Sequence, residues 1–139
     1  MNRAVFLDRD GTLIEEAGYV TRIERMAFYP YSLDAVRLLK RGGFRVVVVT
    51  NQAGVARGYF SEAFVREAHA HLGGRIREAG GEVEAFYYCP HHVNATVADY
   101  RRQCDCRKPK PGMFLTAARE HDIDLSRSFA VGDRWHDVE

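Results

Sequence analysis

The sequence contains no apolar run that approaches membrane-spanning length, and its first residues, MNRAVFLD, become charged too soon for a secretory signal peptide. It also contains no internal repeat and no low-complexity linker. These absences argue against membrane-spanning, secreted and multidomain classes of protein. We therefore expect a soluble, cytoplasmic protein with no membrane partner, in which residues 1–139 form one domain around one core.

Cysteine is scarce, and neither sign of charge dominates. The three cysteines are an odd number, which argues against a closed disulfide framework. The net charge of +1 argues against a protein that binds polyanions through its overall charge. The charge is uneven, however: residues 101–110, RRQCDCRKPK, carry five basic side chains and one acidic one, so this segment is +4 and the remainder is −3. Such a patch attracts phosphate, either on a small molecule or on nucleic acid.

Short apolar runs alternate with segments of helical periodicity. Ser32 and Ser61 stand where helix N-caps are expected, and Gly42 or Gly43 can end the first helix. The alternation predicts an α/β fold with a Rossmann-like, doubly wound parallel sheet joined by right-handed crossovers. The expected strands are residues 4–7, 44–50, 83–89 and 128–133, and the expected helices are residues 32–43, 61–81 and 111–122.

The last predicted strand has no complete helix after it. The segment RWHDVE begins a helix and the sequence then stops, which leaves this strand at an edge of the sheet unless a further helix and strand follow. Such a unit needs roughly 25 residues. We therefore expect the 139 residues to be part of a longer chain.

Polar side chains stand at the ends of three predicted strands. Asp8, Thr50 and Asp133 each follow or end an apolar run, and Asp10 comes two residues after Asp8. Ligands of open α/β sheets bind at the carboxyl ends of the strands, so we expect these residues at one rim. Mg²⁺ prefers carboxylates and waters, and a metal there would offset the repulsion between the acids.

The same residues suit phosphoryl transfer. Asp8 can direct one oxygen to a metal and the other to phosphorus, while Asp10 can donate a proton to the leaving oxygen and later take one from water. Thr50 can donate its hydroxyl to a phosphoryl oxygen. A lysine is still needed to balance the charge, and Lys108 and Lys110 are both candidates.

All three cysteines fall within residues 89–106. Cys89 and His91, followed after a gap by Cys104 and Cys106, offer three thiolates and an imidazole, a set typical of a closed structural zinc site. His92 is an alternative fourth ligand. Zinc would order a long loop with little apolar content, and four protein ligands would leave no open position for a hydrolytic water.

Four motifs resemble those of the haloacid dehalogenase superfamily of phosphohydrolases: FLDRDGT, VVVVTNQ, RKPKPGM and VGDRWHD. The resemblance implies that Asp8 is the nucleophile that becomes a phosphoaspartate and that Asp10 is the general acid and base. It implies that Thr50 and Lys108 stabilise the phosphoryl group, with Lys108 favoured over Lys110 by its place in the family's third motif. It further implies that Asp8, the backbone carbonyl of Asp10 and Asp133 hold Mg²⁺.

Four further segments resemble the heptose bisphosphate phosphatase branch of that superfamily: GYV at residues 18–20, TNQAGVARGYF, YYCPHH and CDCRKPKPGM. This resemblance implies a capless, monomeric domain and favours His91 over His92 as the zinc ligand. Ala53 departs from the branch, in which serine is common at that position. The resemblance also implies that the substrate is contacted by Glu16, Ala17, Gly18, Tyr19, Asn51, Gln52, Ala53, Arg107 and Arg134.

The expected function is therefore that of a Mg²⁺-dependent phosphatase that removes the 7-phosphate of D-glycero-D-manno-heptose 1,7-bisphosphate in the synthesis of heptose and lipopolysaccharide precursors. Its partner would be a small phosphorylated sugar, and Arg107 could bind the second phosphate. One alternative is the related histidinol-phosphate phosphatase. Another is a zinc-stabilised nucleic-acid-binding module at residues 101–110, but aromatic residues are few there and the acidic rim would repel backbone phosphates.

Overall fold

The computed structural model describes residues 1–16, 18 and 21–133, and it confirms a parallel α/β sheet. The four strands lie side by side in the order β3-β2-β1-β4, and every neighbouring pair is parallel. Parallel neighbours require crossover connections, which the intervening helices supply. The strands are β1 (Ala4–Leu7), β2 (Arg45–Asn51), β3 (Ala85–Cys89) and β4 (Phe129–Val131).

The centre of the sheet is formed by β1 and β2. All of β1 is buried, and so is the run from Val46 to Thr50 in β2. β-Branched side chains suit a strand that is covered on both faces, which explains the continuous apolar run VVVV. The register pairs Leu7 with Val48 of β2 and Val131 of β4, so that these strands point their carboxyl ends to one edge of the sheet.

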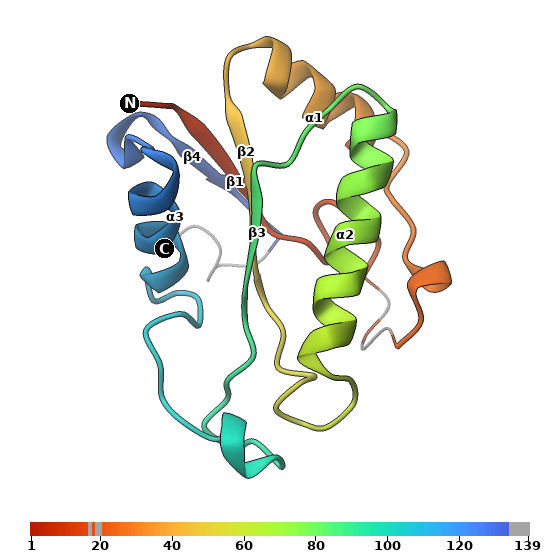
Figure 1. The fold of residues 1–139 in the computed structure, drawn as a ribbon, viewed down its shortest axis with the longest axis vertical. Coiled ribbons are helices and arrows are strands. Elements are labelled where there is room, and N and C mark those ends of the chain that lie inside the picture. The colour runs from red at the N-terminus through yellow and green to blue at the C-terminus, as the bar shows by residue number, and fades with distance from the viewer. Residues whose placement is uncertain (17, 19–20, 134–139) are drawn as a thin grey trace.

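Helices cover both faces of the sheet, as Figure 1 shows. On one face, Val36 and Leu72 pack against Val48 in one apolar cluster, and on the other, Met113 packs in a second cluster with Val49. The first face is covered by α1 (Ser32–Arg41) and α2 (Glu62–Glu78), and the second by α3 (Gly112–His121); the short 3₁₀ turns are η1 (Ile23–Arg25), η2 (Ala98–Tyr100) and η3 (Leu125–Arg127).

The two predicted serine caps have different outcomes. The Ser61 side chain accepts a hydrogen bond from the Phe64 backbone N–H at 3.1 Å and caps α2, as predicted. The prediction for Ser32 is wrong, because this residue lies inside the first turn of α1 and follows Tyr31 at the cap position. Its hydroxyl is buried and donates to the Leu13 carbonyl at 2.6 Å. The side chain is therefore engaged in a tertiary hydrogen bond and does not cap the helix.

The connection from β3 to α3 leaves the sheet at the carboxyl end of β3 and carries η2 at its far end (Figure 1). A backbone hydrogen bond of 2.9 Å, from the Val97 N–H to the Ala56 carbonyl, attaches it to the loop between β2 and α2. Among the helices that the structure describes, none has the length and apolar character needed to cross a membrane.

Candidate active site

A buried ion pair lies at the carboxyl edge of the sheet. Asp8 directly follows β1, and its backbone N–H donates to the Val131 carbonyl at 3.0 Å. Lys108 Nζ donates to Asp8 Oδ1 at 3.1 Å and to the Val49 carbonyl at 3.0 Å. Lys108 is only 3% exposed, whereas the side chain of Lys110, the other candidate lysine, is exposed. The structure thus places Lys108 beside the first aspartate.

Asn51 holds the backbone of Lys108. Its Oδ1 accepts from the Lys108 N–H at 3.0 Å, and its Nδ2 donates to the Lys108 carbonyl at 3.3 Å. The side chain predicted to contact substrate therefore binds the chain segment that carries the lysine. The peptide bond from Lys108 to Pro109 is cis.

Gln52 connects the threonine to the second aspartate. Its Nε2 donates to Thr50 Oγ1 at 3.0 Å and to Asp10 Oδ2 at 3.3 Å. Thr50 is 1% exposed and lies inside β2, which continues one residue beyond the end expected at Thr50. Because its oxygen accepts from Gln52, the Thr50 hydroxyl hydrogen remains available to donate to a phosphoryl oxygen.

Asp133 packs against the loop that carries the paired aspartates. It lies two residues beyond β4, and its side chain is close to Gly11. A Cβ built on Gly11 would lie 2.2 Å from Asp133 Oδ2, and Gly11 has a φ of +83°. Glycine is therefore needed at this turn both for the backbone conformation and for the approach of the carboxylate.

These acids suit Mg²⁺ in their chemistry. Asp8 and Asp133 supply carboxylate oxygens from neighbouring strands, and Asp10 lies on the turn between them. Mg²⁺ binds one or two carboxylates and completes its octahedral shell with carbonyl oxygens and waters. The residues present therefore fit this ion.

The remaining predicted substrate residues differ in exposure and in their place along the chain. Ala53 and Arg107 are half-buried, next to Gln52 and Lys108 in the chain. Glu16 and Gly18 are exposed on the segment after the aspartate loop. The predictions for Ala17, Tyr19 and Arg134 fall outside the described residues.

Arg9 and His69 are two site residues to which the sequence assigns no role. Arg9 is 4% exposed and grips Asp10 with its guanidinium fork, from Nε to Oδ1 and from one terminal nitrogen to Oδ2, both at 3.0 Å. Its other terminal nitrogen lies 3.2 Å from His69 Nε2. The burial of His69 could have been predicted from its helical spacing, since it lies on the same buried face of α2 as Val65 and Leu72.

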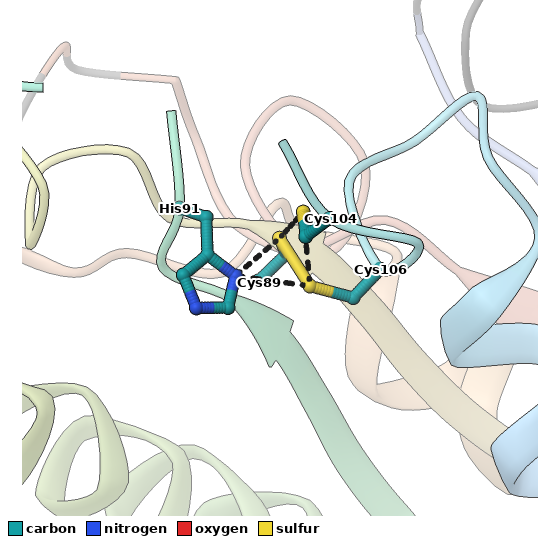
Figure 2. A group of neighbouring side chains, drawn as sticks. All are labelled: Cys89, His91, Cys104 and Cys106. Atoms are coloured by element: carbon teal, nitrogen blue, oxygen red, sulfur yellow. Dashed lines mark hydrogen bonds between the residues drawn. A yellow bond between two sulfur atoms is a disulfide. The ribbon is translucent and has the colours of Figure 1, made fainter. Parts of the chain in front are cut away.

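The three thiols and one imidazole predicted from the sequence converge in space (Figure 2). The ligand atoms of Cys89, His91, Cys104 and Cys106 lie within 4.8 Å of one another. Cys104 Sγ is 3.3 Å from Cys89 Sγ and 3.4 Å from Cys106 Sγ, and His91 Nδ1 is 3.4 Å from Cys106 Sγ. His92, the alternative ligand, instead accepts the Asn94 N–H through its own Nδ1 at 3.0 Å.

Cys89 and Cys106 are joined as a disulfide and Cys104 is a free thiol, so the three cysteines do not form a closed disulfide framework. The convergence of the cluster brings two of the thiols within bonding reach and leaves Cys104 beside them. Burial, with Arg102 nearby, lowers the pKa of His91 and favours its neutral form. A neutral imidazole and thiolates are the states in which these groups bind a metal, so the donor set fits zinc in the reduced protein.

The cluster of Cys89, His91, Cys104 and Cys106 is attached both to β3 and to the start of α3. Cys89 is the last residue of β3 and is fully buried, while Gly112 begins α3 against the cysteine loop. A Cβ on Gly112 would lie 2.2 Å from the Asp105 carbonyl oxygen, so only glycine permits this approach. The loop is also tied to α2, because Glu62 accepts hydrogen bonds from the hydroxyls of Tyr100 at 2.7 Å and Tyr88 at 2.8 Å.

The comparisons with known proteins agree with this arrangement. The chain is 45% identical over 138 residues to D-glycero-beta-D-manno-heptose-1,7-bisphosphate 7-phosphatase of Pasteurella multocida, covering 99% of this chain and 74% of that protein. The chain belongs to this phosphatase family. The Escherichia coli K12 member of the heptose bisphosphate phosphatase family is 43% identical over 136 residues, covering 98% of this chain and 71% of that protein.

Solved structures lead to the same family. A D,D-heptose 1,7-bisphosphate phosphatase from B. bronchiseptica, complexed with magnesium and phosphate, is 35% identical with a TM-score of 0.85, covering 97% of this chain and 72% of that one. An HAD-like phosphatase from Mesorhizobium loti is also 35% identical, with a TM-score of 0.91, and this chain spans 65% of its length. A family model described as HAD-hyrolase-like matches residues 105–139.

Membership in the heptose bisphosphate phosphatase family bears on the alternatives. The relatives are enzymes that hydrolyse a phosphate monoester, which confirms the expectation of a phosphatase. Membership in this family does not favour a nucleic-acid-binding module or a histidinol-phosphate phosphatase. The basic segment is also divided in space, since Lys108 turns into the sheet while Arg101 and Arg102 are exposed.

Proposed function

We propose that this chain, as a single domain over residues 1–139, is a Mg²⁺-dependent phosphatase that removes the 7-phosphate of D-glycero-D-manno-heptose 1,7-bisphosphate. The observation that carries the proposal is the buried contact between Lys108 Nζ and Asp8 Oδ1, at the edge where Thr50 and Asp10 also lie. A lysine, a hydroxyl and two carboxylates at one sheet edge provide a nucleophile, a proton carrier and donors for phosphoryl oxygens.

The chemistry proceeds in two balanced steps. The Asp8 oxygen that does not bind Lys108 attacks phosphorus, the bond from phosphorus to the sugar oxygen breaks, and Asp10 transfers its proton to that oxygen. Asp10 then takes a proton from water, the resulting hydroxide attacks the phosphoaspartate, and phosphate leaves while Asp8 is regenerated. Lys108 and Thr50 donate hydrogen bonds to the phosphoryl oxygens in both steps.

Mg²⁺ would be held by Asp8, the backbone carbonyl of Asp10 and Asp133. When bound, it supplies positive charge that lets a carboxylate approach a phosphate dianion. This part of the proposal is supported by the oxygen donors at the rim and by the magnesium in the related B. bronchiseptica structure.

Zinc would be held by Cys89, His91, Cys104 and Cys106 in the reduced protein. Four protein ligands make this a structural site, and its chemistry is to order the loop of residues 89–106. That loop ends directly before Arg107 and Lys108, so its order positions the phosphate-binding segment.

The preference for a sugar bisphosphate rests on the names of the relatives and on the charge beside the site. One phosphate engages Lys108 and Thr50, and Arg107, half-buried next to Lys108, can bind the second with its planar fork. We further propose that the protein acts as a cytoplasmic monomer in the synthesis of heptose precursors of lipopolysaccharide, with a small phosphorylated sugar as its partner and no nucleic acid.

The test is a panel of kcat/KM values on both anomers of the heptose bisphosphate, histidinol phosphate and fructose 1,6-bisphosphate, with Asp8→Asn as the blank. We expect the heptose bisphosphates to exceed the other substrates by at least roughly tenfold, since a matched polar site rejects substrates that leave its groups unpaired. A higher value for histidinol phosphate would overturn the substrate assignment. Turnover in the blank similar to that of the natural sequence would overturn the mechanism.

A further inference from the structure

Behind Asp10 lies a buried charged residue that the two catalytic steps do not use. Arg9 stands between the two aspartates in the sequence, yet its side chain turns away from the solvent and is 4% exposed. A buried guanidinium requires partners, because moving it out of water is costly. Its partners here are the carboxylate of Asp10 and the ring of His69.

The contacts to Asp10 leave its carboxylate little freedom. Arg9 donates to both oxygens at 3.0 Å, and Gln52 donates to Oδ2 at 3.3 Å. A carboxylate offers about four lone-pair positions, so these three donors account for all but about one of them. The carboxylate plane is therefore set by Arg9 and Gln52, and the remaining position is the one through which a proton can be exchanged.

His69 holds the far end of the guanidinium. Its ring is 5% exposed and stacks on Phe86, with ring centroids 4.7 Å apart and an interplanar angle of 17°, and Tyr88 lies edge-on to it at 6.0 Å. Arginine can only donate hydrogen bonds, so His69 Nε2 must carry the lone pair and Nδ1 the proton. A ring fixed by β3 on one side thus accepts from Arg9 in one defined tautomer.

We propose that Arg9 and His69 are positioning residues for Asp10, in which His69 orients the guanidinium and the guanidinium orients the carboxylate that moves the proton. The proposal rests on the role of Asp10 in the proposed function. It explains why a charged side chain is buried next to a catalytic loop, where an apolar residue would fill the same space without needing partners.

The proposal predicts a dependence on the leaving group. A sugar alkoxide is a poor leaving group and needs the proton from Asp10, whereas p-nitrophenolate leaves without one. For both substrates kcat/KM reports the steps up to phosphoenzyme formation, so the second, hydrolytic use of Asp10 does not enter. Loss of positioning therefore lowers kcat/KM for the sugar phosphate much more than for p-nitrophenyl phosphate.

The matched variants are His69→Leu, which removes the acceptor, and His69→Gln, which keeps an acceptor oxygen within reach of Arg9. We expect His69→Leu to lower kcat/KM for the heptose bisphosphate roughly 10- to 100-fold, and that for p-nitrophenyl phosphate less than roughly threefold, because general acid catalysis contributes about 10²–10⁴-fold. We expect His69→Gln to restore the ratio of the two values to within roughly threefold. Leu72→Val, a buried change one turn further along α2, should leave the ratio unchanged.

Equal losses on both substrates, or no loss in His69→Leu, would overturn the positioning role. A second measurement needs no variant: nitrogen chemical shifts of the natural protein should show a protonated Nδ1 and an unprotonated Nε2 for His69, and the opposite tautomer would overturn the contact. If the natural protein hydrolyses no phosphate monoester, the proposed function fails, while the tautomer still decides whether His69 accepts from Arg9.

Discussion

At the scale of single residues, the site is a set of buried and half-buried charges that stabilise one another. Asp8 and Lys108 pair at 3.1 Å, and Arg9 and Asp10 pair through a two-point contact. Removing one partner of a buried pair leaves an uncompensated charge, which typically costs roughly 3–5 kcal/mol. Substitutions at this rim therefore need a measurement of folding beside each measurement of activity.

Asp8→Asn tests the nucleophile with the smallest change in shape. We expect turnover to fall at least roughly 1,000-fold, because an amide cannot form the phosphoaspartate, while the far-UV circular dichroism spectrum stays unchanged. Asp34→Asn, at an exposed position of α1, is the matched control and should keep full activity. Activity in Asp8→Asn within tenfold of the natural sequence would contradict the assignment.

His69 makes the stability of the folded protein depend on pH. Burial and the neighbouring Arg9 lower the pKa of His69 to about 3, whereas the unfolded chain has a pKa near 6.5. Between these values the unfolded state binds more protons, so the free energy of unfolding falls as the pH drops below about 6.5, by up to about 1.4 kcal/mol per pH unit. Above about pH 6.5 the ring is neutral in both states, so His69 no longer lowers the free energy of unfolding.

Urea unfolding from about pH 7.5 to about pH 4.5 measures this dependence. We expect His69→Gln to have a shallower loss of stability towards acid than the natural sequence, since glutamine does not titrate. His71→Gln removes an exposed histidine of the same helix and should keep the original slope. The same slope for His69→Gln would show that the buried ring is not held neutral.

At the scale of elements, the loop between β3 and α3 depends on contacts outside its own sequence. Its cysteines and His91 meet in one cluster, Tyr100 binds Glu62 at the start of α2, and Val97 binds the Ala56 carbonyl. The hydrogen bonds from the two tyrosines lower the pKa of Glu62, which keeps this acceptor charged. Lys108 lies in the same loop, two residues after Cys106, so the order of the cysteine cluster bears directly on the ion pair with Asp8.

Cys106→Ser tests the role of the cluster in this loop. We expect zinc content to fall from about one ion per chain to nearly none and the melting temperature to decrease by several degrees, because three ligands hold zinc less tightly and the loop loses its cross-link. Elemental analysis and a thermal melt of the reduced proteins measure both. His92→Gln should leave both values unchanged, since His92 Nδ1 binds the Asn94 N–H. Full zinc content in Cys106→Ser would refute the ligand set.

At the scale of the whole molecule, the sheet assembles the site from segments that are distant in the chain. Asp8 follows β1, Thr50 lies in β2, Asp133 follows β4 and Lys108 precedes α3. The parallel register directs these strands to the same edge, where ligands of open α/β sheets bind. The two proposed metals also have separate places, since the cysteine cluster begins at the end of β3 and the acids lie beyond β1 and β4.

Removal of Mg²⁺ should separate activity from folding. We expect dialysis against a chelator that leaves zinc bound to lower turnover at least roughly 100-fold, with recovery on adding Mg²⁺, because the carboxylate then has to approach an unneutralised phosphate. The melting temperature should change little, since oxygen ligands at an open rim do not cross-link the core. Zinc retention is verified by elemental analysis, and undiminished turnover without Mg²⁺ would contradict the metal requirement.

Some features of this protein follow from the amino-acid sequence alone. The order of apolar runs and helical segments determined the α/β class, and each predicted strand and helix appears within a few residues of its expected bounds. The candidate phosphoryl-transfer and metal-binding residues could also be recognised, because an aspartate pair at a strand end and three clustered cysteines form short sequence motifs. These features could be predicted because they depend on neighbours in the chain and on the alternation that buries one face.

Other features were decided only by the tertiary structure. Lys108 and Lys110 are equivalent by charge; the family resemblance favours Lys108, and it is the packing that shows Lys108 reaching Asp8. Ser32 matches a helix cap in sequence, yet its hydroxyl binds the Leu13 carbonyl, and His69 becomes the partner of Arg9 only when α2 lies over the sheet. The physical reason is common to all three: hydrogen bonds and ion pairs are short-ranged, so their partners are set by how the elements pack and not by spacing along the chain.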